Sequence, residues 1–187
     1  MKKMLANVAM AMVLAMGMVV NAEASNFDDT VFGQSVYETI AKSSTCKMVN
    51  LGGIRENEMV LMDTKVDPVL DLPIELMKYA FMNDALYNTE VNFKESNLEN
   101  FDILLKKLTK KYGKGKLWGS YKEVNGRTDI GCSWKFNDKF IVLYYLEEKA
   151  DGYKSLALNV AGKAGVRASL TSTTTAELLS RTEGVSI

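Results

Sequence analysis

Apolar and polar residues alternate along several short stretches of the chain, and each alternation predicts a β-strand. In the clearest case, from Tyr87 to Phe93, every second residue is apolar or a threonine, and the residues between are Asn or Glu. This pattern is typical of an antiparallel strand with one buried face. Strands are predicted over Cys46–Leu51, Met59–Asp63, Ile74–Met82, Leu86–Phe93, Lys116–Tyr121, Thr128–Phe136, Phe140–Leu146 and Tyr153–Val160.

Two other stretches have a helical period, and each begins with a capping signal. Ser35 stands three residues before Glu38, and Ser96 stands three residues before Glu99, which is the spacing of a capping box. The first stretch then carries Val36, Tyr37 and Ile40 on one side, and the second carries Leu98, Phe101, Leu105, Leu108 and Tyr112. The second pattern predicts a helix that ends at Gly113 in a left-handed conformation.

The longer helix should stabilise the fold through this apolar side. Leu105→Ala is expected to cost about 2–5 kcal/mol. Lys107→Ala, a surface change by the same pattern, is expected to cost less than about 0.5 kcal/mol.

Each helical stretch precedes about four predicted strands. The chain therefore predicts an α+β fold of two tandem units, each of one helix plus about four antiparallel strands, with the helices on one face of the sheet. The units would span about 33–93 and 96–160 within a single domain, 25–161. Residues 162–187 are expected to form a flexible or loosely docked tail.

Connections between the predicted strands carry turn signals. Asn-Asp pairs at 83–84 and 137–138 each follow an apolar stretch and predict tight hairpins in the two halves. Lys65–Pro73 contains both prolines of the chain and is expected to be a loop.

Residues 1–24 have the pattern of a secretory signal peptide. Lys2 and Lys3 give a positive start, an apolar stretch extends from Met4 to Val20, and Ala22-x-Ala24 forms a small-residue cleavage site. A transmembrane anchor is the alternative, because the apolar stretch approaches the roughly 20 residues needed to span a bilayer. We expect cleavage before Ser25 and a periplasmic or secreted protein, where disulfides can persist.

The composition excludes several kinds of chemistry. The 187 residues include no histidine, which removes histidine-dependent hydrolase triads and nearly all catalytic zinc sites. The 23 basic and 23 acidic residues balance, and without residues 1–24 the net charge would be −1, which argues against nucleic acid as a partner. No glycine-rich phosphate loop is present. We therefore predict no enzyme activity, no cofactor and no metal.

Two weak patterns leave a histidine-free hydrolase as a lesser hypothesis. Ser44-Thr45-Cys46-Lys47 matches the Ser-x-x-Lys pattern of penicillin-recognising enzymes but lacks their other motifs. Carboxylates that could form an acid–base pair are Asp63, Asp67, Asp71, Glu75, Glu147 and Glu148. Solvated loop charges are the simpler interpretation of these residues.

The two cysteines stand one in each half of the chain. In an oxidising compartment, Cys46 and Cys132 could form one disulfide that joins the halves. The alternative is two separate core cysteines that behave as small apolar residues.

The segment from Tyr112 to Tyr121 is the candidate binding site. It combines three aromatic residues with glycines and lysines, and we single out Trp118, Tyr121 and Lys116. Exposed aromatic residues are typical of protein-binding hot spots. The structural alternative is that Trp118 closes one end of the core.

The tandem helix and four-strand layout over Ser35–Val160 resembles the secreted β-lactamase inhibitor proteins, which bind an enzyme with the concave face of a sheet. That family has a disulfide within each unit, whereas this chain has one cysteine per unit. Leu105-x-x-Leu108-Thr-x-x-Tyr112-Gly113 and Phe81–Tyr87 also resemble small exported bacterial proteins of unassigned role.

These resemblances imply a binding module rather than an enzyme. We expect an exported, non-catalytic binding protein, of the inhibitor or immunity type, whose partner is another protein. The alternative function is a small-ligand carrier or sensor with a pocket between helix and sheet.

Overall fold

The computed structural model describes residues 31–42, 45–49 and 58–162. The predicted signal peptide and residues 163–187 of the predicted tail lie outside this part of the chain. The described residues form two helices, α2 (Val36–Lys42) and α3 (Leu98–Tyr112). Neither is long and apolar enough to cross a membrane. The strands are β1 (Lys47–Val49), β2 (Glu58–Asp63), β3 (Ile74–Met82), β4 (Ala85–Phe93), β5 (Lys116–Val124), β6 (Arg127–Phe136), β7 (Lys139–Glu148) and β8 (Tyr153–Gly162).

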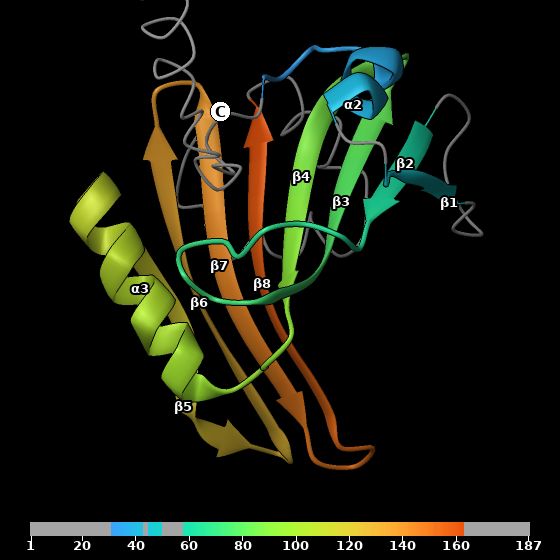
Figure 1. Ribbon diagram of the computed structural model, residues 1–187. Helices are drawn as coiled ribbons and strands as arrows, with labels where there is room; N and C mark the ends of the chain where they lie inside the picture. The colour runs from blue at the N-terminus through green and yellow to red at the C-terminus, as the bar shows by residue number, and fades with distance from the viewer. Residues whose placement is uncertain (1–30, 43–44, 50–57, 163–187) are drawn as a thin grey trace, which may run out of the picture.

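All eight strands belong to one sheet (Figure 1), in the order β1-β2-β3-β4-β8-β7-β6-β5. Every neighbouring pair is antiparallel. The two halves of the chain meet where β4 pairs with β8, with Thr89 opposite Val160 and Val91 opposite Leu158. The last strands of the two halves therefore lie side by side at the centre of the sheet.

The predicted fold class, α+β in two helix-plus-four-strand units, is wrong. The described residues are 55% strand and only 18% helix, and they form one continuous sheet. The physical reason is the pairing of β4 with β8, because main-chain hydrogen bonds between them leave no boundary between the halves.

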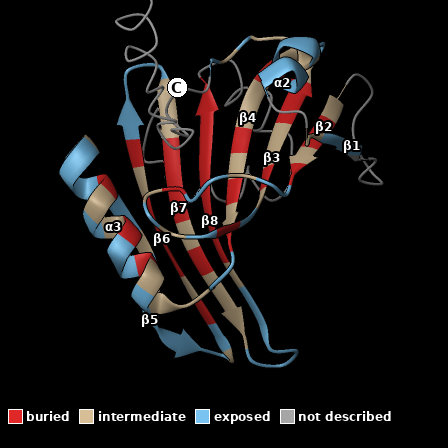
Figure 2. Cartoon of the chain, viewed as in Figure 1, coloured by how far each residue is buried: buried red, intermediate tan, exposed pale blue. Residues whose placement is uncertain are grey.

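One face of the sheet packs against α3, and we call it the helix face. Phe101, Leu104 and Leu108 of α3 are fully buried there. They belong to one apolar cluster with alternate residues of the central strands, including Val91, Leu143 and Leu158. Figure 2 shows this burial in the middle of β4, β8 and β7, whereas β5 at the edge is mostly exposed.

The helical face of α3 is largely the one predicted, since Phe101 and Leu108 are buried in the cluster and Leu98, Leu105 and Tyr112 pack against it. Leu105, expected to be central, is only half-buried, and Leu104 takes the fully buried position. The cap also differs, because the side chain of Asn97, not Ser96, accepts from the backbone N–H of Asn100 at 2.8 Å. Ser96 instead accepts from the backbone N–H of Leu156 in β8, so it joins the helix start to the sheet. The predicted helix end at Gly113 is confirmed in position and has a positive φ of +82°, but its ψ of −166° lies outside the left-handed helical region.

Helix α2 has the predicted capping box but not the expected burial. Ser35 Oγ accepts from Glu38 N at 3.2 Å, and Glu38 Oε2 accepts from Ser35 N at 2.7 Å. Tyr37 is 82% exposed and Ile40 is also exposed, while Thr39 is the buried residue of the helix. Its apolar side therefore does not cover the sheet as a whole, although Val36 packs on the smaller cluster at one end of β3 and β4.

The predicted turns and loop are confirmed. Asn83 and Asp84 both have positive φ between β3 and β4, and Asn137 has positive φ between β6 and β7. The β2–β3 loop, residues 64–73, crosses the helix face toward α3 (Figure 1) and inserts the buried side chain of Val69 into the core.

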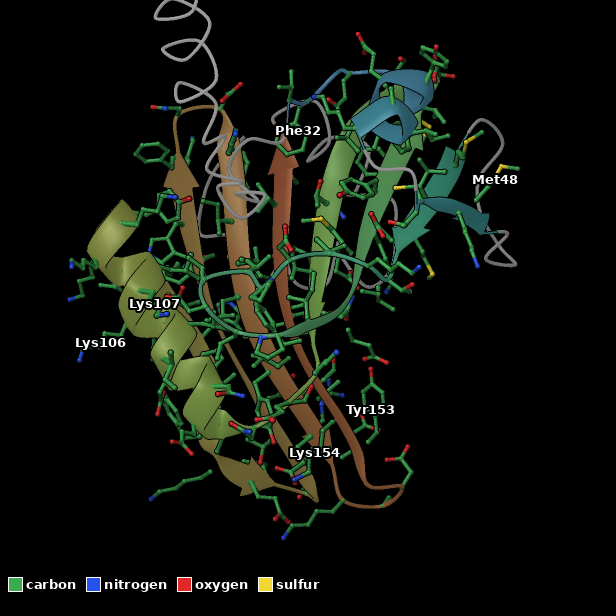
Figure 3. All side chains as sticks on the ribbon, viewed as in Figure 1. Phe32, Met48, Lys106, Lys107, Tyr153 and Lys154 are labelled. Carbon is green, nitrogen blue, oxygen red and sulfur yellow. The ribbon has the colours of Figure 1, made fainter. Side chains whose placement is uncertain are left out.

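Lys107 fixes this β2–β3 loop to α3. Its Nζ donates to the carbonyl of Leu70 and to Asp71 Oδ2, each at 2.7 Å. Lys107 is thus not the free surface lysine that its position in the sequence indicated. Lys106, one residue earlier, extends away from the sheet (Figure 3) and is exposed.

Candidate functional site

The opposite side of the sheet points away from both helices. Side chains alternate along a strand, so the neighbours of core residues point to this side. Tyr144, for example, lies between the core residues Leu143 and Tyr145. We call this side the open face. Its residues used below are Lys78, Asn88, Glu90, Asn92, Lys116, Trp118, Gly131, Val142, Tyr144, Tyr153, Ala157, Asn159 and Ala161.

The half of the open face over β3 and β4 is polar. Lys78 Nζ and Glu90 Oε1 form an ion pair of 2.7 Å between adjacent strands. Asn92 Nδ2 donates to the same Glu90 oxygen at 2.8 Å. Because these groups bond to one another, they form a fixed polar surface. It contains one carboxylate, Glu90, rather than the pair that acid–base catalysis of this kind needs.

The other half carries the largest aromatic side chain of the face. Trp118 of β5 lies over Gly131 of β6, and a Cβ at Gly131 would meet the indole ring at 2.0 Å. Tyr144 of β7 stands directly across from Gly131 on its other side. The missing side chain at Gly131 therefore makes the room in which the tryptophan ring lies.

Tyr144 and Tyr153 extend this surface. The Tyr144 hydroxyl is hydrogen-bonded to the Ser155 side chain. Burial raises the pKa of Tyr144 well above its usual value, and the nearby Glu90 and Tyr153 raise it further by smaller amounts. Tyr144 is consequently uncharged at every physiological pH. Tyr153, at the start of β8 (Figure 3), is 51% exposed. We call Trp118, Tyr144 and Tyr153 the aromatic patch.

Charged residues border the aromatic patch at the ends of β6 and β7. The Arg127 guanidinium lies 3.2 Å from Asp129 and 3.6 Å from Glu148. A shallow hollow of about 240 Å³ lies beside it, lined by Gly119, Ser120, Lys122, Val124, Arg127 and Asp129. Aromatic residues with an adjacent arginine form the kind of surface on which protein hot spots are found.

The structure separates the three residues singled out from the sequence. Lys116 and Trp118 lie on the open face, where the register pairs them with Ser133 and Gly131. Tyr121 lies on the helix face instead, where its hydroxyl donates to Asp102 Oδ1 at 2.7 Å. Its ring packs edge-on against Phe101, with ring centres 6.1 Å apart. Burial and the bond to Asp102 raise the pKa of Tyr121 to about 12. The contacts with Asp102 and Phe101 place Tyr121 at the edge of the α3 interface, where the residue is 43% exposed.

Tyr144 and Tyr153 were not predicted as site residues. An alternation signal was present, since Tyr144 lies between two core residues of one predicted strand and Tyr153 begins the next one. What the sequence lacked was the order of the strands, which brings β5, β6, β7 and β8 together.

The two cysteines lie in separate surroundings and are not bonded to each other. Cys46 Sγ lies 3.8 Å from Asp63 Oδ2, near β2. Cys132 is 2% exposed on the helix face of β6 and belongs to the apolar cluster. Of the two cysteines, only Cys132 is the apolar core residue that the alternative described, because Cys46 is half-buried beside Asp63.

Cys132 is expected to be unreactive in the folded protein. Burial raises the pKa of its thiol from 9.0 to about 11, which leaves roughly a hundredfold less thiolate at neutral pH. Alkylation at pH 8, followed by mass spectrometry, should modify Cys46 and leave Cys132 unmodified until the protein unfolds. Rapid modification of Cys132 under native conditions would contradict its placement in the core.

The Cys132 thiol also makes the free energy of unfolding depend on pH in the alkaline range. Folding raises the pKa, so above pH 9 the unfolded chain releases a proton that the folded protein keeps. Stability from this group is therefore complete below pH 9 and is lost as the pH rises through 11. Denaturant titrations should show a smaller loss over this range in Cys132→Ala than in the unchanged protein.

The carboxylates proposed for a hydrolase do not converge. Asp63 is buried and accepts from the Thr45 hydroxyl at 2.5 Å and from the backbone N–H of Lys65 at 3.0 Å. Asp71 pairs with Lys107, and Glu147 pairs with Lys154 at the far end of the sheet. Ser44 lies outside the described residues. Within the described ranges, no group of three acidic or cysteine side chains could hold a metal ion.

The helix–sheet interface is tightly packed. Phe101, Leu104 and Leu108 of α3 have no exposed surface there. At one end of the interface, Trp134 Nε1 donates a hydrogen bond of 2.9 Å to the Gly113 carbonyl, just after the helix. This packing argues against the pocket that a small-ligand carrier would need between helix and sheet.

Comparisons with family models, with curated proteins and with solved structures found no match to this chain. The part of the chain that the structure describes is predominantly β, with one antiparallel sheet, helices on one side and an aromatic patch on the other.

Proposed function

We propose that this chain is an exported, non-catalytic binding protein of the inhibitor or immunity type, which binds another protein through the aromatic patch. The observation that carries the proposal is the position of Trp118, Tyr144 and Tyr153 together on the sheet face opposite both helices. Tyrosine and tryptophan bury large areas and keep a polar group for a hydrogen bond.

The chemistry of the surface agrees with this proposal. The acidic groups near the patch are paired with Lys78 or Arg127, so they stabilise the surface and leave the aromatic rings to make the contact.

Site-specific photo-crosslinking tests this proposal in cells that export the protein. A photoreactive residue at Tyr153 should capture a protein partner, while the same residue at Lys106 on α3 should not. With the captured partner purified, Trp118→Ala should weaken binding about thirtyfold or more, which corresponds to a hot-spot loss of roughly 2 kcal/mol.

Two controls separate binding from stability. Tyr153→Ala removes an exposed ring and should weaken binding without changing the melting temperature. Lys106→Ala should change neither quantity. If Trp118→Ala and Tyr153→Ala lower only the melting temperature, and affinity in the folded fraction is preserved, the aromatic patch is not the binding site.

A further inference from the structure

Lysines gather where the C-terminal end of α3 meets the β6–β7 hairpin. We call this group the lysine end, and its members are Lys110, Lys111, Lys114, Lys135 and Lys139. Residues 103–122 contain no Asp or Glu, and residues 130–146 contain only Asp138, in the hairpin turn. Four of the five lysines are exposed, and Lys139 is partly exposed. The chain balances its charges as a whole, so this end concentrates positive charge that acidic residues offset elsewhere.

Contacts between α3 and β6 hold the two lysine-bearing segments together. The rings of Tyr112 and Phe136 have their centres 5.2 Å apart. Trp134 Nε1 donates to the carbonyl of Gly113, directly before Lys114. The end of α3 and the β6–β7 turn therefore lie at the same end of the molecule (Figure 1).

The lysines are close enough to affect one another. Burial lowers the pKa of Lys111, and the charge of Lys139 lowers it further. In the part of the chain that the structure describes, Lys110, Lys114 and Lys135 form no ion pair with a carboxylate. Lysines in the last turn of a helix stabilise it through the helix dipole, but Lys114, Lys135 and Lys139 lie outside α3. A surface that holds like charges together favours a negatively charged partner.

Two features favour a lipid surface over an acidic protein or a nucleic acid. The lysine end contains no arginine, and lysine acts as a point charge, whereas arginine provides the planar fork used for specific recognition of carboxylates and phosphates. In addition, Phe136 is 44% exposed at the end of β6, directly after Lys135 and three residues before Lys139. Basic residues around an exposed aromatic ring are typical of proteins that lie on anionic membranes.

We propose that the lysine end docks on the surface of an anionic lipid bilayer, with its lysines at the headgroups and the Phe136 ring in the interface. Lysine side chains are long enough to keep their charge in water while an adjacent apolar group enters the bilayer. Phe136 contacts Tyr112 of α3 and so lies on the helix face, opposite the aromatic patch. A bilayer and a protein partner would therefore not compete for the same surface. This inference goes beyond the proposed function and does not depend on it.

Co-sedimentation of the full-length chain with lipid vesicles tests the proposal. Vesicles of about one part phosphatidylglycerol to three parts phosphatidylcholine should bind it more tightly than vesicles of phosphatidylcholine alone, and added salt should remove the difference. Lys110→Gln combined with Lys135→Gln should weaken binding to the anionic vesicles about thirtyfold, because each lysine at such a surface contributes about fivefold. Lys65→Gln combined with Lys94→Gln is the matched control. It makes the same change in net charge at exposed positions after β2 and β4, and it should leave binding nearly unchanged.

Phe136→Ala separates a bilayer from other anionic partners. It should weaken binding to the anionic vesicles about fivefold or more, and Phe136→Leu should restore most of the loss if the ring acts as an apolar anchor. Equal binding to the two kinds of vesicle, or an equal loss from both pairs of glutamines, would overturn the proposal. Tight binding to polyglutamate or DNA, with no effect of Phe136→Ala on vesicles, would overturn it in favour of an acidic macromolecule. Melting temperatures of all variants check the fold, and crosslinking at Tyr153 tests the proposed function separately.

Discussion

Replacing Leu104 by alanine is expected to lower the free energy of unfolding by about 2–5 kcal/mol, the range for a fully buried leucine. Leu104 has no exposed surface and packs in the apolar cluster between α3 and the helix face. The alanine would leave a cavity there, because interiors packed at this density relax only partly. Chemical denaturation of both proteins measures the change.

Neighbouring positions of the same helix serve as controls. Ile103 is 36% exposed, so Ile103→Ala should cost less than about 1 kcal/mol. Leu105→Ala should fall between these two values, since Leu105 is half-buried. An effect of Leu105→Ala larger than that of Leu104→Ala would mean that α3 is rotated relative to the sheet.

Replacing Gly119 by alanine is expected to destabilise the protein by about 3 kcal/mol or more, through strain and collision together. Gly119 has φ +78°, a conformation that residues with a side chain rarely adopt. A Cβ there would also lie 2.1 Å from the carbonyl oxygen of Asp129 on the paired strand. That oxygen belongs to the backbone, so relief would require β5 to move away from β6.

Gly126→Ala is the matched control for this change. Gly126 has nearly the same backbone angle, φ +79°, but no atom lies within 4 Å of its missing side chain. Gly126→Ala should therefore lower the free energy of unfolding only by the cost of placing alanine at a positive φ, about 1 kcal/mol. Since β5 carries Trp118, Gly119→Ala should also impair the aromatic patch, whereas Gly126→Ala should not. Equal melting temperatures for the two variants would contradict the close contact between β5 and β6.

Local patterns located most of the elements in the described part of the chain. Ile74–Met82 was predicted with the observed boundaries, and the other strands to within a few residues, apart from the end of the predicted Cys46–Leu51, which lies outside the described residues. Turns depend on residues that tolerate positive φ, so Asn83 and Asn137 identified two hairpins. The capping box at Ser35 and the helix end at Gly113 were predictable for the same reason, because each depends on residues within a few positions of it.

The candidate site was only partly predictable. The sequence indicated Trp118 and Lys116, which share the open face, but it grouped them with Tyr121, which packs on the helix face. Gly119 interrupts the regular alternation with its positive φ, and the register of β5 and β6 is irregular between Ser120 and Val124. Despite this irregularity, strict alternation from Trp118 places Tyr121, three residues later, on the opposite face, where it lies, so the prediction grouped the two by closeness in sequence alone.

The sequence by itself determined where the strands, turns and helix α3 lie, because hydrophobic period, caps and turn residues act over a few neighbouring positions. The tertiary structure alone decided that the two halves form one sheet, since Val91 and Leu158 have the same alternation whether or not their strands pair. It also decided which leucine of α3 is buried and which aromatic residues share the open face. These outcomes depend on strand order and register, which are set by contacts between residues far apart in the chain.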